Sequence, residues 1–298
     1  MEYKLSFQIS PLAYSSRAEY LTTKVLNCSE SGVSDKIYCS EEIIVSLTTH
    51  GRRLYEVYLA IESIMQQTMK PNRIILWLSD ELKNSSLPLV LQKQQKRGLD
   101  IRYCKDILTY TKLIPALKAF PQAVIITIDD DCLYHFDLIE NLFNAYYGKK
   151  RKGKESPKLV HCARMHRMKL IDKNTLEKYK KWELNYSNFD ISPLNFPTGV
   201  GGVLYPPNCF NEEVFNEKVF MDICKYADDV WFKSMALLNG THAQKIYTHN
   251  KNGEDYLDNL NVQDIRAGLI NWDKEMNDVQ LKAVFDKYNL YDRLIESC

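Results

Sequence analysis

Three consecutive carboxylates, Asp129, Asp130 and Asp131, follow directly after an apolar, largely β-branched run over residues 123–128. Such a run predicts a strand buried on both faces, so the carboxylates begin where burial ends. Adjacent carboxylates repel one another, and removing one from water without a partner costs several kcal/mol. The triplet therefore predicts a site where a hard divalent cation, Mn2+ or Mg2+, neutralises the carboxylates together with substrate phosphates. The alternative is a solvated loop that caps the next helix, for which one aspartate would suffice.

A second pair of carboxylates, Asp228 and Asp229, opens a predicted helix that extends to Leu238. Free N–H groups and the helix dipole favour a carboxylate in the first turn, so capping accounts for one of the two. The functional interpretation of the other is a general base. It would stay ionised at the mouth of the site and take a proton from an acceptor hydroxyl.

A glycine-rich turn and a late histidine complete the candidate residues. Gly199, Gly201 and Gly202 precede a predicted strand and would let a ligand approach backbone N–H groups closely, although a tight turn without a ligand explains them equally well. The turn is not a dinucleotide-binding fingerprint, because that motif follows a strand and opens a helix. His249 follows a predicted strand over residues 243–247. A lone histidine is more often structural, but a site with few protein ligands favours it as a metal ligand.

The surrounding pattern predicts strands that alternate with helices. Apolar runs predict strands over residues 43–47, 73–78, 101–104, 123–128 and 159–166. The intervening segments predict helices over residues 54–65, 89–97, 112–120 and 136–147. This alternation is typical of βαβ units, so the sequence predicts the α/β class with a mostly parallel sheet. Ligands of such sheets bind beyond the carboxyl ends of the strands, where the polar segments 48–53, 79–80 and 129–131 converge.

The composition is that of an ordinary globular protein of 298 residues, with 45% hydrophobic and 26% charged residues. A net charge of +1 gives no electrostatic case for nucleic-acid binding. Eight cysteines contain no Cys-x-x-Cys pair, which excludes zinc-ribbon and thioredoxin-type sites.

The sequence also predicts where the protein is located. Without a signal-peptide pattern or an apolar run of about 18 residues, we expect a cytoplasmic protein without membrane spans. The basic run 149–154 predicts a solvated loop; the alternative is peripheral contact with anionic lipids at the inner membrane face or with a phosphate-bearing acceptor.

In chain order, these blocks resemble the GT-A-fold, nucleotide-sugar-dependent glycosyltransferases, and the bacterial family 2-like enzymes in particular. The resemblance rests on Thr-Thr-His-Gly-Arg after the first strand, Ser-Asp after the second, the acidic triplet, the glycine-rich turn, Asp-Asp-Val-Trp-Phe and the late histidine. It spans residues 42–250 and implies a Rossmann-like, mostly parallel central sheet flanked by helices. Residues 1–41 would form an N-terminal extension, and residues 251–298 a helical segment packed on the core.

The resemblance also implies where the donor would bind. The ends of the first two strands would surround the nucleotide base, which is uracil or its equivalent, and Asp129 and Asp130 would lie nearer the ribose. Lys112 is a candidate phosphate or ribose contact on charge grounds, or else a surface lysine at a helix start. The candidate donor-binding residues are Thr48, Thr49, Arg52, Asp80, Lys112, Asp129, Asp130, Gly201 and Gly202.

By the same resemblance, Asp131 and His249 would bind the metal ion, Asp229 would be the base and Asp228 would help to place the acceptor. The implied reaction is metal-dependent transfer of a sugar to a hydroxyl of a glycan or lipid-linked glycan, with inversion, in surface polysaccharide or glycoconjugate synthesis. A metal ion would stabilise the charge of the departing diphosphate. Two alternatives stay open: a non-catalytic nucleotide- or sugar-binding module on the same scaffold, and a metal-dependent nucleotidyl- or phosphotransferase.

Overall fold

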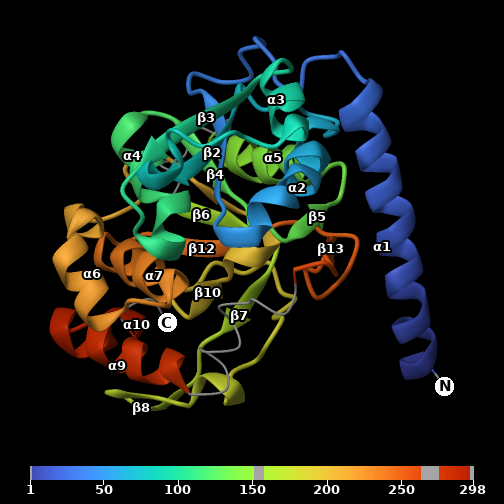
Figure 1. Cartoon of the computed structure of the whole chain (residues 1–298). Coiled ribbons are helices and arrows are strands. Elements are labelled where there is room, and N and C mark those ends of the chain that lie inside the picture. Colours follow the sequence, from blue (N-terminus) through green and yellow to red (C-terminus); the bar gives the residue numbers. More distant parts are fainter. Residues whose placement is uncertain (1, 151–157, 263–274, 296–298) are drawn as a thin grey trace.

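A computed structural model describes residues 2–150, 158–262 and 275–295 of the chain. Its centre is a seven-stranded sheet in the order β12-β6-β11-β4-β1-β2-β3 (Figure 1). The strands are β1 (Ile43–Thr48), β2 (Arg73–Ser79), β3 (Leu99–Cys104), β4 (Val124–Thr127), β6 (Leu159–Cys162), β11 (Val203–Tyr205) and β12 (His242–Lys245). In this sheet only β11 runs antiparallel to its neighbours. The predicted α/β class with a mostly parallel central sheet is therefore confirmed, as the GT-A resemblance implies.

Helices cover both faces of the sheet, and this explains the apolar runs of its strands. The helices around the sheet are α2 (Val57–Met65), α3 (Leu89–Gln95), α4 (Ile114–Ala119), α5 (Leu138–Lys150), α6 (Glu217–Ile223), α7 (Asp228–Leu238), α9 (Met276–Tyr288) and α10 (Tyr291–Ile295). In β1, Ile43, Val45 and Leu47 pack in the layer that contains α2 and α5, whereas Ile44 packs in the layer that contains α4, α7 and α9. Residues 151–154 of the basic run lie outside the described residues.

The N-terminal segment forms a long helix, α1 (Glu2–Asn27), where the sequence shows only weak periodicity. It runs along one flank of the molecule and contacts α2, α3 and β13 (Figure 1). Leu21 of α1 packs with Leu59 and Leu133, and the Tyr14 hydroxyl donates to Asn259 Oδ1 at 2.6 Å. The helix thus forms an additional layer on α2. No helix among the described residues is both long and apolar enough to cross a membrane.

In addition to the central sheet, the chain forms short two-stranded sheets. The predicted strand 159–166 divides into β6 and β7 (Met165–Arg167), and β7 pairs with β10 (Asn195–Pro197) outside the central sheet. A short hairpin joins β8 (Leu170–Asp172) to β9 (Thr175–Leu176). β13 (Tyr256–Asp258) pairs with β5 (Cys132–Tyr134), directly after the acidic triplet. Residues 256–258, within the predicted C-terminal helical segment 251–298, therefore form a strand beside the acidic triplet.

Candidate active site

The acidic triplet lies where the order of the sheet reverses. β2 and β3 lie on one side of β1, and β4 lies on the other, so the carboxyl ends of β1 and β4 form the topological switch point at which open α/β sheets bind ligands. Thr49 follows β1, and its hydroxyl donates to Asp130 Oδ2 at 2.6 Å. The structure therefore brings two of the predicted strand ends into direct contact.

Arg53 is a site residue that the sequence did not single out. It lies in the 3-10 helix η1 (Gly51–Tyr55), and its buried guanidinium donates from Nη1 to Asp130 Oδ1 at 2.7 Å. Its Nη2 lies 3.1 Å from Asp131 Oδ2. A protein cation thus pairs with two of the three carboxylates, so part of the charge of the triplet is neutralised without a metal ion. The predicted Arg52 is exposed, with Nη2 3.5 Å from the Asn261 carbonyl oxygen.

Lys112 is a buried cation among carboxylates, not a surface lysine. It ends the 3-10 helix η3 (Leu108–Lys112), and its Nζ donates to Asp129 Oδ1 at 2.8 Å and lies 3.1 Å from Asp228 Oδ2. Burial alone would lower the pKa of Lys112. The neighbouring carboxylates outweigh this effect and raise its pKa well above the usual value, so Lys112 remains protonated.

Asp229 combines a fixed position with a pKa close to neutrality. It lies in the first turn of α7, and the Gly199 N–H is shared between its two oxygens at 3.1 and 3.2 Å. The residue keeps some accessible surface, but burial of its carboxyl group is the largest cause that raises its pKa to about 7. The nearby Asp228 raises this pKa further, whereas Lys112 opposes the shift. A carboxyl group with such a pKa is suited to proton transfer near neutral pH.

Gly199 lies at the point where these groups meet. A Cβ at this position would lie 2.8 Å from Lys112 Nζ, 3.1 Å from Asp229 Oδ1 and 3.7 Å from Asp129 Oδ1. The other two glycines of the turn face different neighbours: Gly201 lies against Arg164, and Gly202, with φ of +91°, lies against Leu138.

We expect Gly199→Ala to disturb the site far more than the fold. The new methyl group would shift the Lys112 ammonium without removing it from its carboxylates, and the end of a lysine chain moves at little cost to the core. Misplacement by about 1 Å at a reacting site reduces turnover by about 100-fold. We therefore expect kcat/KM to fall by about this factor with the thermal midpoint nearly unchanged. Gly148→Ala, where a Cβ meets open space, is the matched control; equal activity in both variants would contradict this prediction.

The other predicted donor-binding residues lie around this centre. Thr48 donates its hydroxyl to the Trp77 carbonyl oxygen at 2.9 Å, so it ties β1 to β2. Asp80 opens the 3-10 helix η2 (Asp80–Leu82) after β2, with a side chain that is 55% exposed and 3.9 Å from Lys83 Nζ. Both therefore stand at the same edge of the sheet as the triplet, Thr48 on β1 next to β4 and Asp80 one strand further, after β2.

The predicted metal ligands Asp131 and His249 have different partners. Asp131 pairs with Arg53, whereas His249 Nε2 lies 2.8 Å from Asp137 Oδ2. Among the described residues, His135, Asp137 and His249 place one ligand atom each within 4.8 Å of the others, and Asp131 is not part of this group. The carboxylate cluster and the histidine cluster are therefore two separate sets of possible metal ligands.

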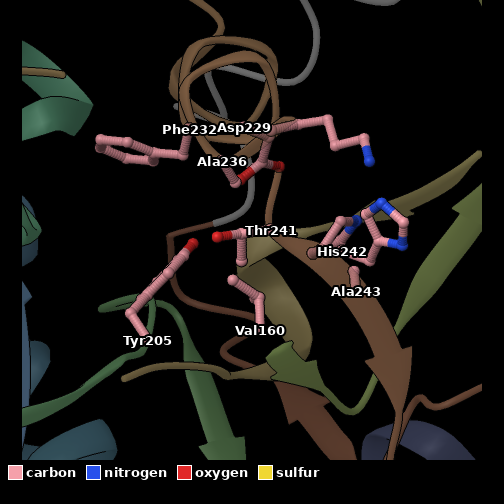
Figure 2. A pocket seen from close by; sticks show the side chains of 10 residues that line it. Val160, Tyr205, Asp229, Phe232, Ala236, Thr241, His242 and Ala243 are labelled. Atoms are coloured by element: carbon pink, nitrogen blue, oxygen red, sulfur yellow. The ribbon is translucent and has the colours of Figure 1, made fainter. Parts of the chain in front are cut away.

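A small cavity lies behind Asp229, on the side of α7 that faces the sheet. Figure 2 shows Asp229 on α7 above the side chains of Tyr205 and Thr241. The cavity volume is about 10 Å³, which suffices for about one water molecule. Lys233 lines it and donates to the Pro193 carbonyl oxygen at 2.6 Å, and burial lowers its pKa to about 7. This cavity is too small for a sugar.

No protein-family model matches the chain, and no curated protein matches it either. Among solved structures, the chain is similar to the inositol-1-phosphate CTP transferase from T. maritima, with 9% identity over 70% of this chain and 86% of that one and a TM-score of 0.38. It is similar to a fragment of TarS from S. aureus, with 12% identity over 69% and 59% and a TM-score of 0.42. It is also similar to the mannosyltransferase PcManGT from Pyrobaculum calidifontis, solved with GDP-Man and Mn2+, with 12% identity over 81% and 64% and a TM-score of 0.41. At these identities and TM-scores the similarities assign no function.

Proposed function

We propose that the chain transfers a sugar from a nucleotide-diphosphate donor to a hydroxyl group of an acceptor. One observation carries the proposal: Asp229, with a pKa of about 7, is fixed by the Gly199 N–H beside a buried cation at the carboxyl edge of the sheet. A general base works best when its pKa is near the working pH. The resemblance to GT-A glycosyltransferases supplies the reaction to which such a base belongs.

The donor would lie at the switch point between β1 and β4. Thr48, Thr49, Arg52 and Asp80 are the proposed surroundings of its base, and Asp129 and Asp130 those of its ribose. Lys112 and Arg53 would face the diphosphate, where fixed positive charge stabilises a departing anion. We take the donor to be a UDP-sugar and the acceptor to be a glycan, as the resemblance implies.

The charge of the site favours a divalent cation. Five carboxylates, Asp129 to Asp131 with Asp228 and Asp229, lie together with Lys112 and Arg53, and these seven described side chains carry a formal charge of −3 when all five carboxylates are ionised. A diphosphate would add further negative charge to this cluster, and carboxylate oxygens are ligands that Mg2+ and Mn2+ prefer. We propose that Asp131 would hold the ion. When bound, it would neutralise charge on the leaving diphosphate.

The protein residues then have defined tasks. Asp229 takes the proton from the acceptor hydroxyl, the acceptor oxygen forms a bond to the anomeric carbon, and the bond from that carbon to the diphosphate oxygen breaks. The pair of electrons leaves with the nucleoside diphosphate. Attack opposite to the leaving group inverts the anomeric centre. Asp228, held by Lys112, would help to orient the acceptor.

A thermal-shift screen of nucleotide sugars tests donor binding. A donor at 100 times its dissociation constant stabilises the folded state by about 2.7 kcal/mol. For a chain of this size we expect a rise of several degrees in the thermal midpoint, largest for a UDP-sugar in the presence of Mn2+ or Mg2+. The metal alone and the free sugar are the controls. If no nucleotide sugar shifts the midpoint beyond these controls, the proposal is wrong.

A further inference from the structure

A histidine cluster, formed by His135, Asp137 and His249, lies apart from the proposed donor site. Each oxygen of Asp137 meets one imidazole: Oδ1 lies 2.6 Å from His135 Nδ1, and Oδ2 lies 2.8 Å from His249 Nε2. The two imidazole rings are 4.3 Å apart between centroids. His135 and Asp137 are partly exposed and His249 is exposed, so the cluster opens to solvent on one side.

Hydrogen bonds to Asp255 hold the backbone of this cluster in place independently of the side chains of His135, Asp137 and His249. Asp255 accepts hydrogen bonds from the N–H groups of His249 and Asn250 at 2.6 Å each through its carboxylate. Its carbonyl oxygen also accepts from the His135 N–H at 2.9 Å. Asp255 therefore ties the segment after β12 to the segment after β5, next to the pairing of β5 with β13.

The histidine cluster is separate from the acidic triplet. Asp131 directly precedes β5 and His135 directly follows it, so the two residues stand at opposite ends of this strand. Four residues of extended chain separate their Cα atoms by about 13 Å. Asp131 also pairs with Arg53 at its own end of the strand. One ion bound between His135, Asp137 and His249 would therefore not be the ion proposed for the donor diphosphate.

We propose that His135, Asp137 and His249 form a second metal site, one that takes a divalent transition-metal ion such as Zn2+. Two imidazole nitrogens and one carboxylate form a donor set that suits Zn2+, Co2+ or Ni2+ and not Mg2+, which prefers an all-oxygen shell. Three protein ligands with an open, solvent-facing side leave a position for water, as in three-ligand zinc sites. The ion would fasten the 249–255 segment to the start of α5.

Metal titration of the full chain tests this second site. The purified protein is treated with a chelator, dialysed and titrated with Zn2+ by calorimetry and with Co2+ by visible absorption. We expect one Zn2+ per chain at this site, with no competition from excess Mg2+. Loss of a residue that hydrogen-bonds to a metal ligand weakens metal binding by about 10- to 100-fold. Loss of a direct ligand should therefore weaken it by at least about 100-fold. We expect this loss in His249→Ala and in Asp137→Asn. His249 is exposed, so its replacement should leave the fold intact.

Two control variants separate this site from the rest of the molecule. His50→Ala removes another exposed histidine, and Asp131→Asn alters the acidic triplet; both should keep the Zn2+ affinity of the unaltered chain. Unchanged Zn2+ binding in His249→Ala would show a hydrogen-bonded His–Asp–His cluster without a metal role and would overturn the proposal. Loss of binding in Asp131→Asn would also overturn it. No nucleotide sugar enters these titrations, so their failure would leave the proposed sugar transfer untouched, and the reverse holds as well.

Discussion

Replacement of Asp229 by asparagine is expected to lower kcat for sugar transfer by about 100- to 10,000-fold, the usual contribution of a general base. Asparagine keeps the size of the side chain and its carbonyl oxygen still accepts from the Gly199 N–H, but it cannot take a proton. Donor affinity should therefore change little, because the nucleotide would contact other residues. Steady-state kinetics and a donor titration by calorimetry separate the two effects.

The same carboxyl group predicts the pH dependence of the reaction. A base works only when ionised, so with a pKa of about 7 for Asp229 the rate should rise as the pH increases through 7. Asp229→Asn should remove this rising limb. Asp222→Asn, on the exposed side of α6, is the matched control and should keep it. Full transfer activity in Asp229→Asn, or an unchanged pH profile, would refute the assignment of the base.

The second large effect is expected from Lys112→Met. Methionine fills a similar volume but leaves Asp129, Asp228 and Asp229 without the cation that they share. Removal of one partner from a buried ion pair destabilises a protein by about 3–5 kcal/mol. We expect a loss of this size in urea unfolding at pH 7, together with loss of transfer activity.

The pH dependence of this loss has a defined sign. The pKa of Lys112 is raised well above its usual value of 10.5, so its stabilising contribution is fully present below that usual value. In Lys112→Met the remaining carboxylates repel one another when ionised, so the deficit should shrink as the pH falls and they take up protons. Lys118→Met, at an exposed position of α4, is the control. A deficit below about 1 kcal/mol at pH 7 would contradict the buried-cluster description.

Local patterns predicted the parts of the fold that depend on local burial. β1, β2 and β4 are buried on both faces, so their sequences are continuous apolar runs. The sequence also singled out the acidic start of α7 as a candidate site, because two carboxylates in a first turn exceed what capping requires. By contrast, the periodicity of residues 2–27 is weak, and α1 was not predicted as a helix.

The parts of the fold and of the site that the sequence did not predict depend on contacts between segments far apart in the chain. The pairing of β5 with β13 joins residues more than a hundred positions apart, and neither short strand has a distinctive sequence. Arg52 and Arg53 are equivalent in sequence, and only the direction of η1 decides that Arg53 meets the carboxylates. The burial of Lys112 depends likewise on the approach of α7 to β4. Gly199 belongs to the turn that the sequence singled out, but its position between Lys112 and Asp229 depends on the same contacts.

Identification of the nucleotide that is released from the donor is the most direct test of the proposed sugar transfer. The chain is incubated with the UDP-sugar that stabilises it, Mn2+ or Mg2+ and a set of glycan acceptors, and the nucleotide product is identified by chromatography, with Asp229→Asn alongside. Glycosyl transfer predicts UDP, formed by the unaltered chain and nearly absent with the variant. Release of UMP, pyrophosphate or a sugar phosphate, or equal amounts of UDP from both proteins, would contradict a sugar transfer that depends on Asp229.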